Sequence, residues 1–84
     1  MIFKVFIDHR LQYEGKVRYI AIPGVMGDMV IMDHHTYLLS GVRRGVLRYL
    51  PEDESERKFE IAQGFIEVSD NVAVGAFVTS ELEP

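Results

Sequence analysis

The sequence predicts an all-β fold: a flattened, antiparallel β-sandwich or barrel of about eight to ten short strands, with no substantial helix. Several short segments alternate apolar and polar residues, which is typical of strands that bury one face. Residues that favour turns separate these segments at short intervals. Along the whole chain, no stretch has the apolar spacing that supports a helix of about ten residues.

The N-terminal half contains two alternating segments and one apolar run. The apolar positions of the two alternating segments are Phe3, Val5 and Ile7, followed by Val17, Tyr19 and Ala21. A turn at residues 14–15 is expected to separate them, because glycine favours turns. The apolar run, residues 26–32, is interpreted as a buried strand. The alternative for this run is a partner surface, because its methionines can adapt to irregular contacts.

The C-terminal half begins with a bend. Residues 38–46 have helix-like apolar spacing, but Gly41 and Gly45 disfavour a helix, so this stretch is interpreted as a bend between strands with a short helical turn as the alternative. The charged residues 51–57 are expected to form a solvated hairpin tip. Strands are then expected around residues 58–61, 66–68 and 72–78. Val72 and Val74 are expected to be buried with the apolar residues of the first strand.

Composition limits the classes of function. The chain has 84 residues, enough for one domain, which we assign to residues 1–78, followed by a polar tail at 79–84. Its 13 acidic and 9 basic residues give a formal charge of −4, which disfavours nucleic acid as a partner. The absence of cysteine excludes disulfides and cysteine nucleophiles. The longest uncharged run, residues 71–80, is too short for a membrane-spanning helix.

The residues offer no convincing catalytic, cofactor or metal site. His34 and His35 are adjacent, so in an extended chain they would point to opposite faces and could not both bind one ion. The serines lack a nucleophile-elbow signature, and the glycines of residues 24–27 lack the lysine and helix of a phosphate loop. The pair Arg43-Arg44 is interpreted as an exposed turn, or alternatively as an ion-pairing site for a partner. We therefore expect a protein that is not an enzyme.

Four segments resemble, in the same order, the motifs of one known family. Residues 22–35 run Ile-Pro-Gly-Val-Met-Gly-Asp-Met-Val-Ile-Met-Asp-His-His. This resembles a hallmark of Leu-Pro-Gly, two residues, Gly-Glu-Leu-Gly, two apolar residues and Pro-Gly-His. Residues 38–47, 59–68 and 71–74 resemble a leucine-rich bend ending in Lys-Pro-Gly, a Gly-Gly-Phe-x-Glu-Val strand and an Asn-x-Val-x-Val strand. These motifs belong to the N-terminal β-sandwich domain of the epsilon subunit of F-type ATP synthases.

The resemblance covers essentially the whole chain, with departures in the loops and at the end. Residues 8–11 replace the family's Thr-Pro-Glu-Gly turn, and Asp33-His34 replaces the Pro-Gly before the motif histidine. Typical members continue into a helical hairpin that can inhibit hydrolysis and in some bacteria binds ATP. This sequence stops at Pro84, so we expect residues 1–84 to lack the inhibitory and ATP-binding roles.

The resemblance implies a non-catalytic rotor part that joins the central gamma subunit to the ring of c subunits. It places Val25 and Asp28 at the c-ring loops, with a solvated turn aspartate as the alternative for Asp28. It places His35, Ser40 and Ala62 toward gamma. It also implies a peripheral position at the cytoplasmic face of a bacterial inner membrane, or the plastid equivalent.

A competing hypothesis is a free-standing β-sandwich module that binds peptide or carbohydrate. Such modules usually display aromatic platforms, whereas this sequence has no tryptophan and its four tyrosines are scattered.

Overall fold

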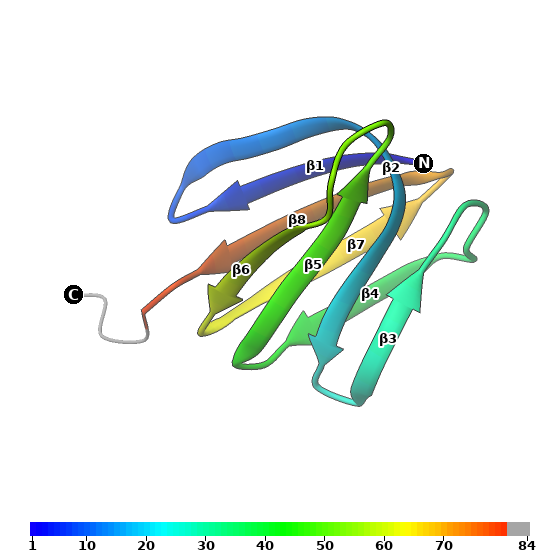
Figure 1. Ribbon diagram of the computed structural model, residues 1–84. Coiled ribbons are helices and arrows are strands. Elements are labelled where there is room, and N and C mark those ends of the chain that lie inside the picture. The colour runs from blue at the N-terminus through cyan, green and yellow to red at the C-terminus, as the bar shows by residue number, and fades with distance from the viewer. Residues whose placement is uncertain (81–84) are drawn as a thin grey trace.

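The computed structural model describes residues 1–80 and shows eight strands and no helix in that range (Figure 1). The strands are β1 (Ile2–Ile7), β2 (Arg10–Gly24), β3 (Gly27–Ile31), β4 (Leu38–Val42), β5 (Gly45–Pro51), β6 (Arg57–Ile61), β7 (Gln63–Ser69) and β8 (Val72–Val78). The prediction of an all-β fold with about eight to ten short strands is confirmed. The interpretation of residues 38–46 as a bend is mostly wrong, because residues 38–42 form β4 and only residues 43–44 connect it to β5. The charged residues between Pro51 and Arg57 form the tip of the β5–β6 hairpin, as expected.

All eight strands belong to one sheet that folds back on itself. The strand order is β1-β8-β7-β4-β2-β5-β6, while β1 also pairs with β2 and β3 pairs with β2. The long strand β2 makes this closure possible, because its first half pairs with β1 and its second half pairs with β3 and β5 (Figure 1). The pairings are antiparallel except for β1 with β8, which is parallel and which the sequence pattern did not indicate.

An irregularity in β2 changes which of its residues face the core. The register of β2 against β5 shifts between Val17 and Tyr19. A β-bulge of this kind breaks the alternation of faces. As a result Val17 and Ile20 are both buried, whereas Tyr19 is half-buried and its hydroxyl donates to the Glu56 carboxylate.

The core is centred on an aromatic cluster. The ring of Tyr49 is fully buried and lies edge-on to Phe3, with 5.2 Å between the ring centroids. Tyr13 and Phe59 contact the same ring at centroid distances of 5.4 and 6.1 Å. Rings at these distances add to the stability that area burial provides. The cluster joins β1, β2, β5 and β6.

The expected burial of β1 is confirmed, and that of β8 is wrong. Phe3, Val5 and Ile7 are buried, but Val72 and Val74 are exposed. Strand β8 instead turns Ala73, Gly75 and Phe77 to the interior. A Cβ atom at Gly75 would lie 2.6 Å from the Phe77 ring and 3.4 Å from the Phe3 ring, so the core needs its smallest residue at that point.

The expected turn at residues 14–15 is also wrong, because Gly15 lies inside β2 and pairs with Phe3. The chain reverses earlier, at Asp8 and His9, which have φ angles of 52° and 69°. Thr79, which follows the last strand, binds the Asp8 carboxylate in this same turn. Residues 81–84 of the predicted polar tail lie outside the described range.

Candidate functional site

The tip of the β2–β3 hairpin presents apolar side chains to solvent. Its two turn residues are Val25 and Met26, and Met26 is 91% exposed. Gly27 follows with a φ of 131°, a conformation that glycine adopts without strain. The interpretation of residues 26–32 as a buried strand is therefore largely wrong, because Ile31 alone is buried. Exposed apolar residues at such a tip are typical of a contact with a partner.

The tip is fixed to the β4–β5 turn. The backbone N–H of Val25 donates to the Gly41 carbonyl at 3.0 Å, and the N–H of Arg43 donates to the Pro23 carbonyl at 2.9 Å. The Arg43 guanidinium also lies 2.7 Å from the Asp28 carboxylate. Both side chains of this pair are well exposed, so its own contribution to folding is at most about 1 kcal/mol. The pair places one negative and one positive group side by side at the tip.

The loop that carries His35 lies at the other end of β3. It is tied down on both sides: the chain amino group lies 2.5 Å from the Asp33 carboxylate, and the His34 N–H donates to the Asn71 side chain at 2.8 Å. The amino group holds the pKa of Asp33 below its usual value. His35 itself is exposed, and its Nδ1 lies 2.8 Å from the Thr36 carbonyl.

The remaining two predicted contact residues lie inside the domain. Ser40 is 9% exposed, and its hydroxyl donates to the Gly41 carbonyl at 2.8 Å. Ala62 is 2% exposed and its N–H donates to the Val78 carbonyl at 2.7 Å. In this conformation neither side chain is available to a partner. Of the five predicted residues, Val25 and Asp28 share the tip and His35 stands apart from them, at the opposite end of β3.

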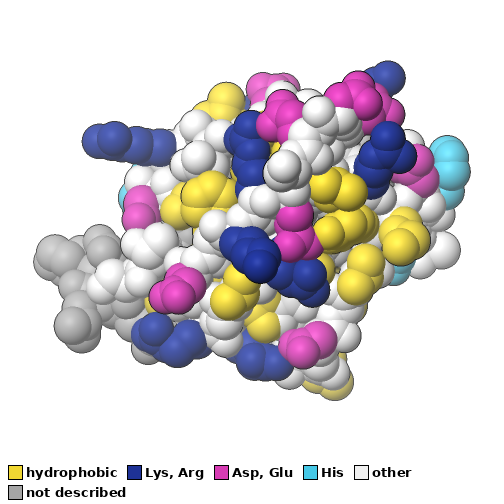
Figure 2. Space-filling model, in the orientation of Figure 1, with side chains coloured by type: hydrophobic (Ala, Val, Ile, Leu, Met, Phe, Trp, Pro, Cys, Tyr) yellow, Lys and Arg dark blue, Asp and Glu magenta, His cyan; other side chains and the backbone are white. Residues whose placement is uncertain are grey.

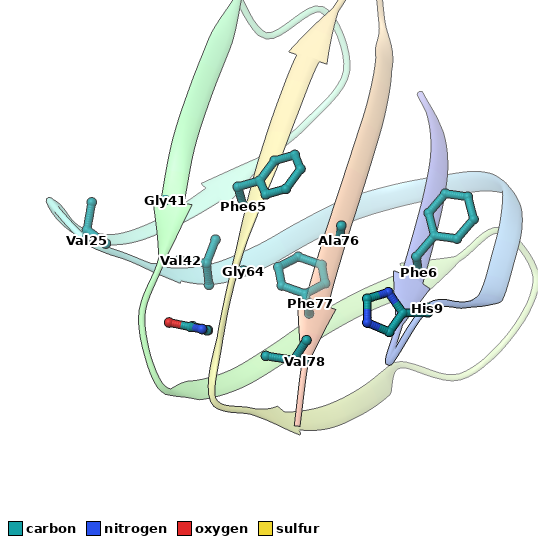
Figure 3. Close-up of a pocket in the computed structure, with 11 residues that line it drawn as sticks. Phe6, His9, Val25, Gly41, Val42, Gly64, Phe65, Ala76, Phe77 and Val78 are labelled. Carbon is teal, nitrogen blue, oxygen red and sulfur yellow. The ribbon is translucent and has the colours of Figure 1, made fainter. Parts of the chain in front are cut away.

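An apolar groove that sequence reasoning missed crosses the ends of β4, β7, β8 and β1 (Figure 3). It encloses about 720 Å³, with Val25 at one end and His9 at the other. Gly41, Gly64 and Ala76 line it without bulky side chains and so leave room for it, whereas Phe6 and Phe65 project beside it. Phe65 is 52% exposed, and it lies opposite Gly41 on one neighbouring strand and Ala76 on the other. The sequence alone does not reveal this groove, because its small lining residues come together beside the Phe65 ring only through the strand register.

Further apolar residues extend this face beyond the groove. Leu39, Val72 and Val74 are exposed on β4 and β8, with the Glu67 carboxylate of β7 between Leu39 and Val74 in the register. The Tyr37 hydroxyl donates to Glu67 at 3.0 Å, which raises the pKa of Tyr37.

The opposite face, formed over β2, β5 and β6, is mixed in charge. Figure 2 shows Lys and Arg side chains interspersed with Asp and Glu on this side. One such cluster joins Arg48 to the Glu56 carboxylate at 3.1 Å, and the Tyr19 hydroxyl binds the same carboxylate. These contacts keep the pKa of Glu56 below its usual value, with the Tyr19 hydrogen bond as the main cause. Charge of a single sign does not dominate the visible surface.

Within residues 1–80, no group of three or more histidine or carboxylate side chains is placed to hold a metal ion. The same range contains no helix that could span a membrane.

Comparisons with known sequences identify the family. Residues 1–75 match the β-sandwich domain of the ATP synthase delta/epsilon chain. The ATP synthase epsilon chain of Syntrophomonas wolfei is 32% identical over 68 residues, which cover 81% of this chain and 50% of that protein. The epsilon chain of Chlorobium limicola is 38% identical over 65 residues, covering 77% of this chain and 74% of the relative. The chain thus spans half the length of one relative and about three quarters of the other.

Solved structures agree on the fold. A chain of the Tetrahymena thermophila mitochondrial ATP synthase central stalk and c-ring superposes with a TM-score of 0.79 at 16% identity, covering 93% of this chain and 63% of that one. A chain of the Euglena gracilis mitochondrial ATP synthase gives 0.79 at 23% identity, covering 96% and 51%. At these identities the likeness concerns the fold alone. With the sequence match over residues 1–75, it follows that the chain belongs to the ATP synthase delta/epsilon family, as its β-sandwich domain.

Proposed function

We propose that this chain is a non-catalytic rotor element of an F-type ATP synthase, which joins the gamma subunit to the c-ring and couples proton flow to ATP synthesis. Family membership supports the assignment to the complex. The observation that carries the linking role is the separation of two exposed contact regions along one rigid strand. The β2–β3 tip and the His35 loop lie at opposite ends of β3.

The tip is suited to the ring. It projects a short apolar turn beside the Asp28–Arg43 pair. The apolar side chains can therefore pack against a partner while the charged groups stay in water at the rim of the contact. The His35 loop is suited to a larger and more permanent partner, because hydrogen bonds and an ion pair hold it in one conformation before binding. Of the three residues proposed for gamma, His35 is accessible, whereas contact through Ser40 or Ala62 would require the domain to open.

The domain acts by holding its partners together, and we propose no bond-making step for it. It reaches the membrane through the complex, at the cytoplasmic face of a bacterial inner membrane or the equivalent plastid face. The residues proposed to contact gamma and those proposed to contact the ring lie at opposite ends of β3, so the two proposals can be tested independently.

The direct test is co-purification of the full 84-residue chain with the gamma subunit of the same organism, followed by binding of the pair to membranes that contain the c-ring. We expect a one-to-one complex with gamma and ring attachment of that complex. A chain that fails to bind gamma, but binds a peptide or a carbohydrate, would replace this proposal with the binding-module hypothesis.

A further inference from the structure

Strand β3 has one edge that pairs with nothing in residues 1–80. Its other edge pairs with β2, from Gly27 opposite Gly24 to Ile31 opposite Ile20. An unpaired strand edge offers a row of backbone N–H and C=O groups to any extended segment that approaches it.

The register shows which backbone groups of β3 face that free edge. The Pro23 carbonyl accepts from Arg43, so the backbone of Pro23 points away from β3. Asp28 lies opposite Pro23, and the two residues of such a non-hydrogen-bonded pair direct their N–H and C=O groups away from each other. Alternation then gives Val30 the same direction. Asp28 and Val30 therefore present their N–H and C=O groups outward, spaced as a strand partner needs.

Another unpaired edge, on β6, is protected in a way that β3 is not. Strand β6 pairs with β5 alone, and it carries Arg57, Lys58 and Glu60 among its five residues. Charged side chains of this kind are a common defence against pairing with another chain. Strand β3 has one charge, Asp28, already paired with Arg43, and its Val30 side chain is 52% exposed.

The position of the free β3 edge, between the two proposed contact regions, points to the partner that would pair with it. The free edge of β3 runs without interruption from the ring-facing tip to the loop that carries His35. A partner that contacts both the His35 loop and the tip can lie along this edge. We therefore infer that an extended segment of the gamma subunit adds to the domain as a strand beside β3, with main-chain hydrogen bonds to Asp28 and Val30. This inference rests on the proposed function, because it names how the gamma contact is made.

The chemistry of the edge also constrains the gamma segment. Strand addition takes its affinity from main-chain bonds and its selectivity from alternate side chains. The side chains that flank the new strand are Val30 and Met32, both exposed and apolar. The segment should therefore be extended, free of proline at its bonding positions, and apolar where it lies beside Val30.

Amide hydrogen exchange on the full chain, followed by NMR with and without gamma, tests the inference directly. The Met29 and Ile31 amides, which bond to β2, should exchange slowly in both states. The Asp28 and Val30 amides should exchange fast in the free chain and slow by at least about tenfold in the complex. Alternation also directs the Lys58 and Glu60 amides of β6 outward, and these should remain fast throughout.

A matched pair of proline variants provides the second arm. Val30→Pro removes an outward N–H from β3, and Glu60→Pro removes one from β6; neither change breaks a bond to the neighbouring strand. We expect Val30→Pro to weaken gamma binding roughly five- to a hundredfold, because one buried carbonyl of the partner loses its donor. Glu60→Pro should leave the affinity within about twofold. If Val30→Pro fails to fold, the exchange measurement on the unmodified chain still decides.

The outcomes separate this inference from the proposed function. Gamma binding with fast Asp28 and Val30 amides would overturn strand addition while leaving the rotor assignment in place. Protection that appears without gamma and grows with chain concentration would assign the edge to a second copy and overturn the inference. Protection by ring-containing membranes alone would do the same. No gamma binding at all would defeat the proposed function itself.

Discussion

The Asp8 carboxylate accepts two hydrogen bonds from Thr79, one from its backbone N–H at 2.9 Å and one from its hydroxyl at 2.6 Å. Asp8 lies in the β1–β2 turn, and Thr79 follows the last strand, so the contact joins the beginning of the sheet to its end. The Asp8 N–H also donates to the Phe77 carbonyl at 2.9 Å. One turn residue therefore fixes where the chain leaves the domain.

This contact predicts a stability change at acidic pH. The Thr79 hydrogen bonds lower the pKa of Asp8 from its ordinary value of 3.8. Because the folded-state pKa is the lower one, the stabilisation is present above the unfolded-state pKa and is lost as the pH falls through the folded-state pKa. Asp8→Asn should lower the urea midpoint at neutral pH and reduce its fall between about pH 5 and pH 2. Thr79→Val, which removes the hydroxyl alone, should act in the same direction but less strongly.

A second prediction concerns the Asp28–Arg43 pair at the hairpin tip. Asp28→Lys should change the free energy of unfolding by no more than about 1 kcal/mol, because both side chains are exposed. It should nevertheless weaken ATP-driven proton pumping by reconstituted membranes, since the proposed ring contact would meet a charge of the opposite sign. The double variant Asp28→Lys with Arg43→Glu restores an internal pair but leaves the reversed pattern, so pumping should remain weak. Full recovery in the double variant would mean that Asp28 acts through Arg43 and not on the ring.

A third prediction separates the accessible residue proposed for gamma contact, His35, from the buried ones. His35→Ala should lower the affinity for gamma without changing stability, because the side chain is exposed and its Nδ1 lies beside the carbonyl of the adjacent Thr36. His9→Ala is the matched control, an exposed histidine in the β1–β2 turn. Ser40→Ala should alter stability rather than affinity, since its hydroxyl bonds within its own strand. Binding and urea unfolding of the unmodified chain and these three variants distinguish the effects. An equal loss of affinity in His9→Ala would remove His35 from the interface.

The alternation of apolar residues predicted the core face of β1 but not of β8, for a physical reason. In β1 the residues between Phe3, Val5 and Ile7 include Lys4, so the pattern marks one face as polar. In β8 every residue is small or apolar, and both faces look alike in the sequence. Which face of β8 is buried depends on tertiary packing, because the Phe77 and Phe3 rings need the space that Gly75 leaves.

The candidate site shows the same limit. The tip and His35 could be proposed as contact regions from local motifs, because each lies within one stretch of sequence. The groove beside Phe65 could not be found that way, because it depends on Gly41 and Ala76 from two neighbouring strands. A glycine in the sequence also does not reveal its role. Gly27 permits a turn, whereas Gly64 permits close contact between β7 and β8.

A fourth prediction follows from Gly64. A Cβ atom there would lie 2.3 Å from the Ala76 carbonyl oxygen and 2.4 Å from the Phe77 ring. The carbonyl belongs to the backbone of β8, so it cannot move without disturbing the β7–β8 ladder. Gly64→Ala should therefore destabilise the domain by about 1–3 kcal/mol, measured by urea unfolding. Ser69→Ala, an exposed position on the same strand, should be nearly neutral, and equal stability of both variants would contradict this account of Gly64.

The last prediction concerns regulation. The resemblance assigns inhibition of hydrolysis in the family to a helical hairpin that reaches from the stalk into the catalytic head. Residues 1–80 form strands and turns without a helix, and the domain measures 36 Å along its longest axis. A helix advances 1.5 Å per residue, so a lever of 30 Å needs about 20 helical residues, and the described residues 1–80 contain no such helix.

Adding the 84-residue polypeptide to an ATP synthase depleted of its epsilon subunit should therefore restore attachment of the head to the ring while leaving ATP hydrolysis at its uninhibited rate. A full-length epsilon subunit that carries the hairpin is the matched control and should restore attachment and lower hydrolysis together. ATP should not bind to residues 1–84 in equilibrium dialysis. Strong inhibition by the 84-residue polypeptide would show that the β-sandwich domain itself regulates the head, contrary to the role proposed for it.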